Sequence, residues 1–419
     1  MPHPDPVILP ASFNRLAWSN LAAQSAEQVA LAAAPLVAVL ALGAGAAETG
    51  MLQTILTLPF VLFAIPAGLL ADRLPRRVVM ASAEALRATG LVGVLAAIAV
   101  GVLTLPLLAG LGFLAVCGTV AYSVAAPALV PALVAPRALP AANARIELAR
   151  TIAFAAGPAV GGALVGWAGA GPAFALAAAL SGVAVVLLAG LEEPARAAAP
   201  RRQPLAEIRE GAAFVFRHSL LRPMFVTQVI FNTAWFVILA VFVPYAVRRL
   251  GLSASGVGIT LGMYGVGMVA GALAAPRVLR AIPFGTVIAI GPVAGLVAAI
   301  LIALTTVVPS PALAALGFFM LGLGPILWVI STTTLRQTVT PPDLLGRVSA
   351  INIMAYGARP LGSALGAAIA LAWNAEACLY AAVAGFALQA AVILASPAVG
   401  LLRQPEMAGL EPERRCARA

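Results

Sequence analysis

Long runs of apolar residues, nearly free of charge, fill most of this chain and restrict its fold more than any other feature. The hydrocarbon core of a bilayer is about 30 Å thick, and a helix of about 20 residues crosses it. Backbone polar groups must be hydrogen-bonded inside lipid, so such runs are expected to form helices. Only 10% of the 419 residues are charged and 62% are hydrophobic, too little polarity to cover a soluble protein. The sequence therefore predicts an all-α membrane protein.

We predict twelve transmembrane helices from these runs and their Gly, Pro or charged boundaries. They cover residues 14–42, 50–71, 78–100, 103–126, 143–168, 171–191, 223–247, 255–277, 284–306, 311–335, 346–372 and 376–398. One long polar segment separates the first six from the last six. The expected organisation is an N-terminal six-helix bundle over 1–191, a cytoplasmic middle loop over 192–222, a C-terminal six-helix bundle over 223–398 and a cytoplasmic tail over 399–419.

The basic residues predict the orientation of these helices. All 25 are arginine, and with a cytoplasmic N-terminus only Arg248 and Arg249 fall in outer loops. This asymmetry follows the positive-inside rule and predicts both termini in the cytoplasm. The net charge of +10 then reflects contact with anionic membrane lipid, and no soluble basic face is left for nucleic acid. The richness in alanine and arginine without lysine is typical of a GC-rich bacterial genome, which places the chain in the cell inner membrane.

Several classes of function are excluded by missing residue types. Without lysine the chain has neither a P-loop nor a Schiff-base site. The two histidines, His3 and His218, lie in polar segments and form no zinc motif, and the three cysteines are far apart. No clustered catalytic set lies in the apolar runs. We therefore expect no metal, no cofactor and no enzymatic activity.

Comparison of the two halves reveals an internal repeat. Arg145 and Pro158 match Arg347 and Pro360 at an offset of 202 residues. At an offset of 203 residues, the region of the second predicted helix matches that of the eighth: Gly68, Leu70 and Arg77 correspond to Gly271, Leu273 and Arg280. At an offset of 204 residues, the first predicted helix matches the seventh: Gln24 and Gln28 correspond to Gln228 and Asn232. Matches at nearly one offset predict a duplicated six-helix unit, with a binding site between the halves near the bilayer midplane.

The first predicted helix carries a polar stripe. Asn20, Gln24, Glu27 and Gln28 are spaced i, i+4, i+7 and i+8, within about 100° of arc. Glu27 is the deepest acid, and a carboxylate inside a membrane is a functional hypothesis by default because its charge is costly there. Burial favours its protonated form, so we predict that Glu27 carries a proton or balances a cationic substrate. The structural alternative is an acid satisfied by Gln24, Gln28 or an arginine.

The seventh predicted helix repeats this stripe with Gln228, Asn232 and Trp235, and we expect both stripes to face one cavity. Arg359 lies close to the centre of the eleventh predicted helix, where an arginine must be paired or hydrated. Two roles stay open for it: holding an anionic substrate or acting on Glu27, and capping carbonyls freed by Pro360.

Two acid–arginine pairs have helical i, i+3 spacing near the inner ends of predicted helices. They are Glu84 with Arg87, and Glu147 with Arg150. This spacing places the two side chains of a pair on the same helix face. We interpret both pairs as local ion pairs.

The segment GLLADRLPRR at the end of the second predicted helix resembles the loop 2–3 signature of the major facilitator superfamily, with proline in place of its second glycine. The gating residues that this resemblance implies are Gly68, Asp72, Arg73, Arg76 and Arg77. We expect Asp72 to accept hydrogen bonds at the N-terminus of the eleventh helix, and Glu192 or Glu193 to pair with the arginines. The alternative is a charge cluster that only sets topology.

The fifth predicted helix holds GPAVGG, which resembles the GPxxGG signature of antiporters in this superfamily. Its residues are Gly157, Pro158, Gly161 and Gly162. Proline bends a helix and the glycines form a flat seam, so a packing seam without directional role is the alternative. The segment LGRVSAIN at 345–352 looks like the branch with macrolide and enterobactin exporters. One departure is that the fourth helix lacks the family's motif B arginine and has Cys117 and Thr119 there.

The resemblance implies a secondary transporter with two pseudo-symmetric six-helix bundles and alternating access, which exports small amphipathic molecules by proton antiport. The expected partners are therefore a small-molecule substrate, protons and lipid, and we expect a monomer. Few polar groups in the predicted cavity favour hydrophobic drugs over sugars. Siderophore or other metabolite export is the alternative, favoured by Arg359 if the cargo is anionic. A transport-dead sensor or scaffold would normally add a soluble output domain, and the longest polar segment has only about 31 residues, 192–222.

Overall fold

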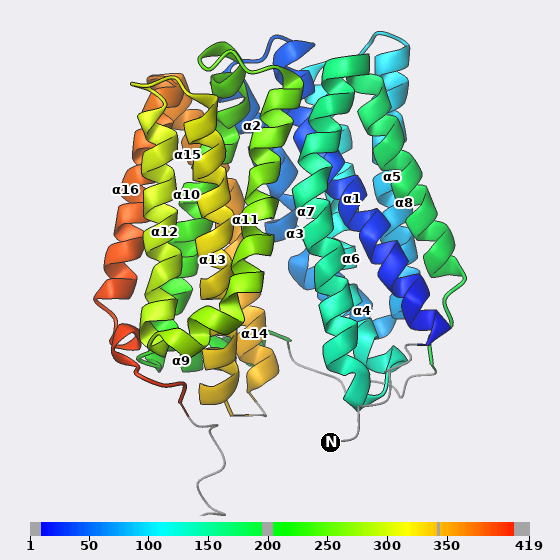
Figure 1. The fold of residues 1–419 in the computed structure, drawn as a ribbon. Coiled ribbons are helices and arrows are strands. Elements are labelled where there is room, and N and C mark those ends of the chain that lie inside the picture. The colour runs from blue at the N-terminus through cyan, green and yellow to red at the C-terminus, as the bar shows by residue number, and fades with distance from the viewer. Residues whose placement is uncertain (1–9, 195–203, 342–343, 406–419) are drawn as a thin grey trace, which may run out of the picture. The chain divides into compact units, whose positions relative to one another are not determined.

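The computed structural model of the chain describes residues 10–194, 204–341 and 344–405, and all regular elements in these ranges are helical (Figure 1). Ten of the helices in these described ranges are long and apolar enough to cross a membrane. They are α1 (Ala11–Leu40), α5 (Arg76–Ala99), α6 (Leu105–Leu133), α7 (Leu139–Ala168), α8 (Ala170–Ala189), α10 (Leu221–Arg248), α11 (Ala254–Ala281), α12 (Phe284–Leu304), α13 (Pro311–Val339) and α16 (Ala375–Leu394). The prediction of an all-α membrane protein is thus confirmed.

The second predicted helix, expected to run unbroken over 50–71, is instead interrupted twice. It consists of α2 (Ala46–Thr57), α3 (Pro59–Leu62) and α4 (Ala64–Arg73). Pro59 begins α3 and cannot donate a backbone hydrogen bond, so the helix is weakened at this point. The prediction of one continuous helix was wrong here because proline chemistry outweighed the apolar run.

The eleventh predicted helix, expected over 346–372, is also divided. α14 (Leu345–Met354) ends in a 3-10 turn, η2 (Ala355–Gly357), before α15 (Ala358–Ala372). Pro360 lacks the amide that would bond to the carbonyl of Tyr356, and the tighter turn accommodates this loss. The division places Tyr356 and Arg359 around the break.

The segment predicted as a polar middle loop contains a helix of its own, α9 (Pro204–Arg217). α9 packs against α14, and a Cβ on Gly211 would lie 2.8 Å from the carbonyl oxygen of Arg347. Arg347 Nη1 also donates to Glu210 Oε2 at 2.6 Å. A glycine is therefore required for the close approach of the two helices, and an ion pair fixes their contact.

The chain divides into two compact units. Unit 1 comprises residues 1–199 and 242–265, and unit 2 comprises residues 200–241 and 266–419. The division cuts through α10 and α11, so the C-terminal part of α10 and the N-terminal part of α11 belong with the first half of the chain. Each unit has its own hydrophobic core.

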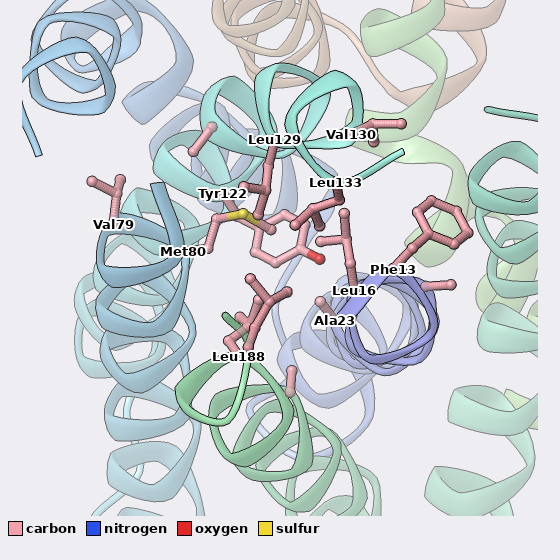
Figure 2. Close-up of a cluster of buried hydrophobic side chains, with 14 of the residues drawn as sticks. Phe13, Leu16, Ala23, Val79, Met80, Tyr122, Leu129, Val130, Leu133 and Leu188 are labelled. Atoms are coloured by element: carbon pink, nitrogen blue, oxygen red, sulfur yellow. The ribbon is translucent and has the colours of Figure 1, made fainter. Parts of the chain in front are cut away.

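The core of unit 1 lies between α1, α5, α6 and α8. Figure 2 shows Tyr122 of α6 among Leu16, Met80 and Leu188, which come from α1, α5 and α8. Tyr122 is 1% exposed. In the same unit α1 packs along α7 and α8, and α5 packs along α6 and α8 (Figure 1).

The core of unit 2 joins the loop-derived helix α9 to the transmembrane helices. Val215 of α9 packs with Leu221 and Met224 of α10, Trp328 of α13 and Val348 of α14. α12 packs along both α13 and α16. The polar middle segment is therefore anchored to the membrane domain by apolar side chains.

Candidate functional site

An arginine shared by two carboxylates lies inside unit 1. Arg87 of α5 is 3% exposed, and its Nη1 is 2.7 Å from Glu84 Oε1, on the same helix. Its Nη2 is 3.7 Å from Glu27 Oε2, on α1. Fully ionised, these three side chains carry two negative charges and one positive charge. The geometry confirms the Glu84–Arg87 ion pair, but it is buried and extends to a second helix.

Two further hydrogen bonds fix the guanidinium of Arg87. Nη1 donates to the carbonyl oxygen of Ala23 on α1 at 2.9 Å, and Nη2 donates to Thr119 Oγ1 on α6 at 2.8 Å. Small residues bring these helices close, since a Cβ on Gly118 of α6 would lie 2.2 Å from the carbonyl oxygen of Ala83 on α5. Arg87 therefore ties α1, α5 and α6 together.

The two carboxylates differ in access. The Glu84 side chain is fully buried, whereas that of Glu27 is 17% exposed and lies at the longer distance from Arg87. A long ion pair at a partly exposed acid is more easily exchanged for a proton or a cation than a short buried one. The structure thus distinguishes a fully buried carboxylate at the shorter distance, Glu84, from a partly exposed carboxylate at the longer distance, Glu27.

Sequence reasoning named Glu27 but missed the role of Glu84 and Arg87. The helical spacing correctly indicated a local pair, but it was taken to lie near the inner end of a helix. In fact Arg87 is the twelfth of the 24 residues of α5, and this central position was the signal for an arginine with partners on neighbouring helices. α6, the helix that lacks the family's motif B arginine, receives the guanidinium of Arg87 at Thr119 instead.

The other polar residues of α1 mostly face α7. Asn20 Nδ2 donates to the carbonyl oxygen of Ile146 at 3.4 Å, and buried Gln28 packs against Gly157, where an added Cβ would lie 2.4 Å from its Cβ. Gln24 is half-buried. The predicted stripe is thus divided: Glu27 contacts α5, while Asn20 and Gln28 hold α1 against α7.

In unit 2 the predicted residues of α10 gather around Arg359 of α15. Arg359 Nε donates to Asn232 Oδ1 at 3.3 Å, and its Cζ lies 4.2 Å from the ring centroid of Tyr356 and 5.4 Å from that of Phe236. Asn232 Nδ2 in turn donates to the backbone oxygen of Gln228 at 2.9 Å. The guanidinium is held by an amide oxygen and by cation–π contacts.

Trp235, the third predicted residue of α10, contacts α13. Its ring meets Phe318 of α13 edge-on, with the centroids 5.6 Å apart. This contact joins α10 to α13 inside unit 2. Whether the stripes of α1 and α10 share one cavity stays a prediction.

The structure describes only part of the loop 2–3 signature. Gly68 and the side chain of Asp72 lie outside the described residues, and Arg73 is exposed. Glu193 accepts from the backbone amides of Arg76 at 3.1 Å and Arg77 at 2.9 Å. These amides open α5, so the carboxylate acts as an anion at a helix N-terminus.

We predicted that Glu192 or Glu193 pairs with the arginines of this signature, and the structure shows which atoms Glu193 contacts. Glu193 binds their backbone amides, and the Arg77 guanidinium instead donates from Nη1 to the carbonyl oxygen of Leu191 at 3.0 Å. Both contacts fasten the end of α8 to the start of α5. The gating role of the signature stays a prediction.

The GPxxGG residues of α7 contact two helices. Gly157 and Gly161 lie against α1, and an added Cβ on Gly161 would lie 2.8 Å from the carbonyl oxygen of Val29. Gly162 lies against α11, where its Cβ would be 2.8 Å from the Cα of Gly258. A Cβ on Gly258 would be 2.4 Å from the carbonyl oxygen of Pro158. The signature is therefore a backbone-to-backbone seam in unit 1.

Arg248, predicted only as an outer-loop arginine, fixes the adjoining end of α10. Its Nη2 donates to the carbonyl oxygens of Gly43 at 3.1 Å and Ala44 at 2.8 Å, just after α1. Gly43 has a φ of +70°, a conformation that favours glycine. Residues 242–265 are thus attached to unit 1 at the α1–α2 turn as well as along α7.

The sequence and fold match known transporters. Residues 16–367 match the sequence profile of the Major Facilitator Superfamily. An uncharacterized MFS-type transporter, y4rN of Sinorhizobium fredii (strain NBRC 101917 / NGR234), is 31% identical over 251 residues, which are 58% of this chain and 59% of that protein. The aligned region therefore spans less than two thirds of the length of this relative.

Solved structures share the fold at low sequence identity. The nucleoside transporter NupG aligns with a TM-score of 0.72 and 16% identity over 92% of this chain and 99% of its own. A POT family transporter in complex with 5-aminolevulinic acid aligns with a TM-score of 0.75 and 12% sequence identity, over 93% of this chain and 97% of its own. A bacterial homologue of the iron transporter ferroportin in an inward-facing state aligns with a TM-score of 0.71 and 16% sequence identity, over 91% of this chain and 98% of its own. With the profile match over most of the sequence, the chain belongs to the major facilitator superfamily.

Proposed function

We propose that this protein is a secondary active transporter that exports small amphipathic molecules by proton antiport, and that Glu27, Glu84 and Arg87 form its proton-coupling site. The observation that carries this proposal is one buried guanidinium shared unequally by two carboxylates, at 2.7 Å and 3.7 Å. A proton on Glu27 removes one of the two negative charges and weakens its ion pair with Arg87.

Such a change can be transmitted to the helices because of what Arg87 holds. The same guanidinium donates to α1 at Ala23 and to α6 at Thr119. When Glu27 is protonated, α1 loses a charged contact with α5 but keeps the hydrogen bond at Ala23. The protonation state of one partly exposed acid therefore alters the packing of α1, the helix that also lies against the GPxxGG seam. In our proposal this coupling drives alternating access.

The test uses purified protein in liposomes with a pH-sensitive dye trapped inside. A panel of cationic, neutral and anionic amphipathic compounds is added under an imposed proton gradient, and compound-dependent proton movement is recorded. We expect proton movement with at least one compound for the wild type, and its loss in Glu27→Gln. Glu84→Gln keeps the exposed acid but frees Arg87 to bind Glu27 tightly, so we expect slower coupling and a shifted pH profile.

Glu147→Gln is the matched control. Glu147 is an exposed acid that pairs with Arg150 on the same helix, α7. The same change of charge at this position should leave proton movement intact. Coupled transport that survives in Glu27→Gln, with the protein verified in the liposomes, would contradict the assignment of the coupling site.

Export of an anionic metabolite, of the siderophore kind, is the second candidate. It is favoured by the position of Arg359, which lies beside the break between α14 and α15 and contacts Asn232 and two aromatic rings. In the same liposomes, coupling confined to anionic compounds and lost in Arg359→Gln would select this candidate over drug efflux.

A further inference from the structure

A pocket inside unit 2 is lined by residues other than Arg359, Asn232 and Tyr356. It is formed where the chain leaving α9 enters α10 and meets α13 and α14. The apolar part of its lining includes Leu221, Met224 and Phe225 of α10. The polar part comprises Trp328 and Arg336 of α13, together with Asn352 of α14.

The polar part of the lining follows from helical spacing. Trp328, Thr332 and Arg336 are spaced i, i+4 and i+8, so they form one face of α13. Thr332 donates its hydroxyl to the backbone oxygen of Trp328 at 2.7 Å, which leaves the two nitrogen donors as the polar groups of this face. The lining of the pocket is therefore amphipathic, because it combines apolar side chains of α10 with nitrogen donors of α13.

Both nitrogen donors lack an acceptor. Nε1 of Trp328 and Nε of Arg336 are buried and have no hydrogen-bond partner among the described residues. Trp328 is only 7% exposed. Buried donors are normally satisfied, because an unmade hydrogen bond is costly away from water. A ligand with an acceptor at this position would remove that cost.

The charge around the pocket selects the kind of acceptor. None of the described lining residues is acidic, and Arg336 contributes a positive charge. The nearby acid of α9, Glu210, is already paired with Arg347 at 2.6 Å. An anion therefore meets an arginine and an indole N–H, with no carboxylate of the lining to repel it.

We propose that this pocket binds an amphipathic organic anion, with its acidic head at Arg336 and Trp328 and its apolar body against Leu221 and Met224. If this anion is the transported substrate, which rests on the proposed export function, the substrate class narrows to amphipathic anions. Binding itself requires neither a proton gradient nor the Glu27 cluster. An anionic lipid has the same chemistry as a soluble carboxylate, and the test separates the two sources.

Three probes with one apolar body and different heads test the proposal: 4-phenylbutyrate, 4-phenylbutanol and 4-phenylbutylamine. Each is titrated into the full chain in phosphatidylcholine nanodiscs without a pH gradient, and binding is followed by calorimetry and by tryptophan fluorescence. We expect phenylbutyrate to bind at least about tenfold more tightly than the alcohol, and the amine not to bind, because only the anion forms charge-assisted hydrogen bonds. The fluorescence change should disappear in Trp328→Phe.

The matched variants are Arg336→Gln and Arg222→Gln. Arg222 is exposed and follows the pocket residue Leu221, so it tests the same charge change outside the pocket. We expect Arg336→Gln to weaken phenylbutyrate binding about tenfold and Arg222→Gln to leave it unchanged. Arg336→Lys keeps the positive charge but lacks the several N–H donors of a guanidinium. It provides an intermediate variant if thermal unfolding shows that Arg336→Gln is unstable.

Equal binding of the three probes, or unchanged phenylbutyrate binding in both Arg336 variants, would overturn the proposal. Replacing part of the phosphatidylcholine by phosphatidylglycerol identifies the occupant. Competition by this lipid that is lost in Arg336→Gln would assign the pocket to a lipid anion, and no competition would assign it to a soluble one. Because no proton gradient is applied, a failure here leaves the result of the liposome test unaffected, and the reverse also holds.

Discussion

The groups that surround the arginine side chains differ between the two units. In unit 1, the guanidinium of Arg87 lies between two carboxylates and is almost completely buried. In unit 2, the guanidinium of Arg359 contacts an amide oxygen and aromatic rings, and Arg336 lines a pocket without an acidic residue among its described lining. The cluster of unit 1 has two carboxylates around one arginine, whereas the pocket at Arg336 has no carboxylate among its described lining residues.

This difference suggests a division of labour between the two units. Carboxylates exchange protons, so the cluster of unit 1 suits coupling to a proton gradient. No described lining residue of the pocket at Arg336 is acidic, so this pocket suits the recognition of an anionic group. The experiments below test this contrast.

Arg87→Gln should have the largest effect. It leaves Glu27 and Glu84 without the cation they share, and breaking a buried pair by removing one partner costs about 3–5 kcal/mol. We expect a large fall in the free energy of unfolding and no proton-coupled transport. Denaturant unfolding followed by helical circular dichroism measures the first, and the liposome assay measures the second.

The double variant Arg87→Gln/Glu84→Gln is the control for this prediction. It restores the original balance by leaving one negative charge, that of Glu27, so it should recover part of the lost stability. If Arg87→Gln alone were as stable as the wild type, the structural role of the shared guanidinium would be refuted.

Gly258→Ala tests whether residues 242–265 depend on the seam of unit 1. The new Cβ would lie 2.4 Å from the carbonyl oxygen of Pro158, so α7 and α11 must separate. Overpacking of this kind costs about 1–3 kcal/mol, and we expect transport to fall with it. The thermal unfolding temperature gives the measurement.

Gly182→Ala is the matched control, because a Cβ on this residue of α8 meets no atom within 4 Å. We expect a neutral or slightly stabilising effect, of about 0.5–1 kcal/mol, from the better helix propensity of alanine. Equal behaviour of the two alanine variants would remove the seam as an explanation of how these helices pack.

Arg359→Gln tests the charge preference of unit 2. If the guanidinium holds an anionic head, transport of anionic compounds should fall about tenfold, which corresponds to about 1.4 kcal/mol, and transport of neutral compounds should change little. Parallel uptake measurements with an anionic compound and its alcohol analogue give the ratio. A uniform loss for both compounds would favour the structural role, in which Arg359 supports the break between α14 and α15.

His218 should produce the smallest effect, as a pH dependence of unit 2. It lies between α9 and α10, burial lowers its pKa below the ordinary 6.5, and its Nδ1 accepts from the amide of Leu220 at 3.2 Å. The unfolded chain binds this proton more readily, so the contribution to stability is present above pH 6.5 and is lost as the pH falls through the lowered pKa.

We therefore expect the unfolding temperature to fall slightly between pH 7 and pH 5, corresponding to about 1 kcal/mol or less. His218→Gln keeps an acceptor but cannot titrate in this range, so it should remove this part of the pH dependence. An identical pH profile in the variant would show that His218 does not contribute.

Much of the fold could be predicted because membrane burial acts on every residue of a helix. The apolar runs predicted ten helices that the structure describes as long enough to cross a membrane. The two interrupted regions could not be predicted from hydropathy, because Pro59 and Pro360 act on single hydrogen bonds and leave the apolar run intact. α9 was missed because its apolar face is short and lies within a polar segment.

The candidate site was predictable only where a single residue stood out. Glu27 and Arg359 were found because charged residues deep in apolar helices are rare. The role of Arg87 was missed because its spacing to Glu84 already explained it as a local pair. The pocket at Trp328 and Arg336 gave no signal, since a tryptophan and a threonine in an apolar helix look like packing residues.

The membrane class, most of the helices and the buried acids and arginines follow from the amino-acid sequence alone, because lipid penalises every unsatisfied polar group independently of the fold. Which of these groups meet depends on the tertiary packing. Glu27 and Arg87 are 60 residues apart and come together through the packing of α1 and α5, and Asn232 and Arg359 meet across 127 residues. Such contacts depend on the rotation and closeness of neighbouring helices, which small residues such as Gly118 and Gly258 permit.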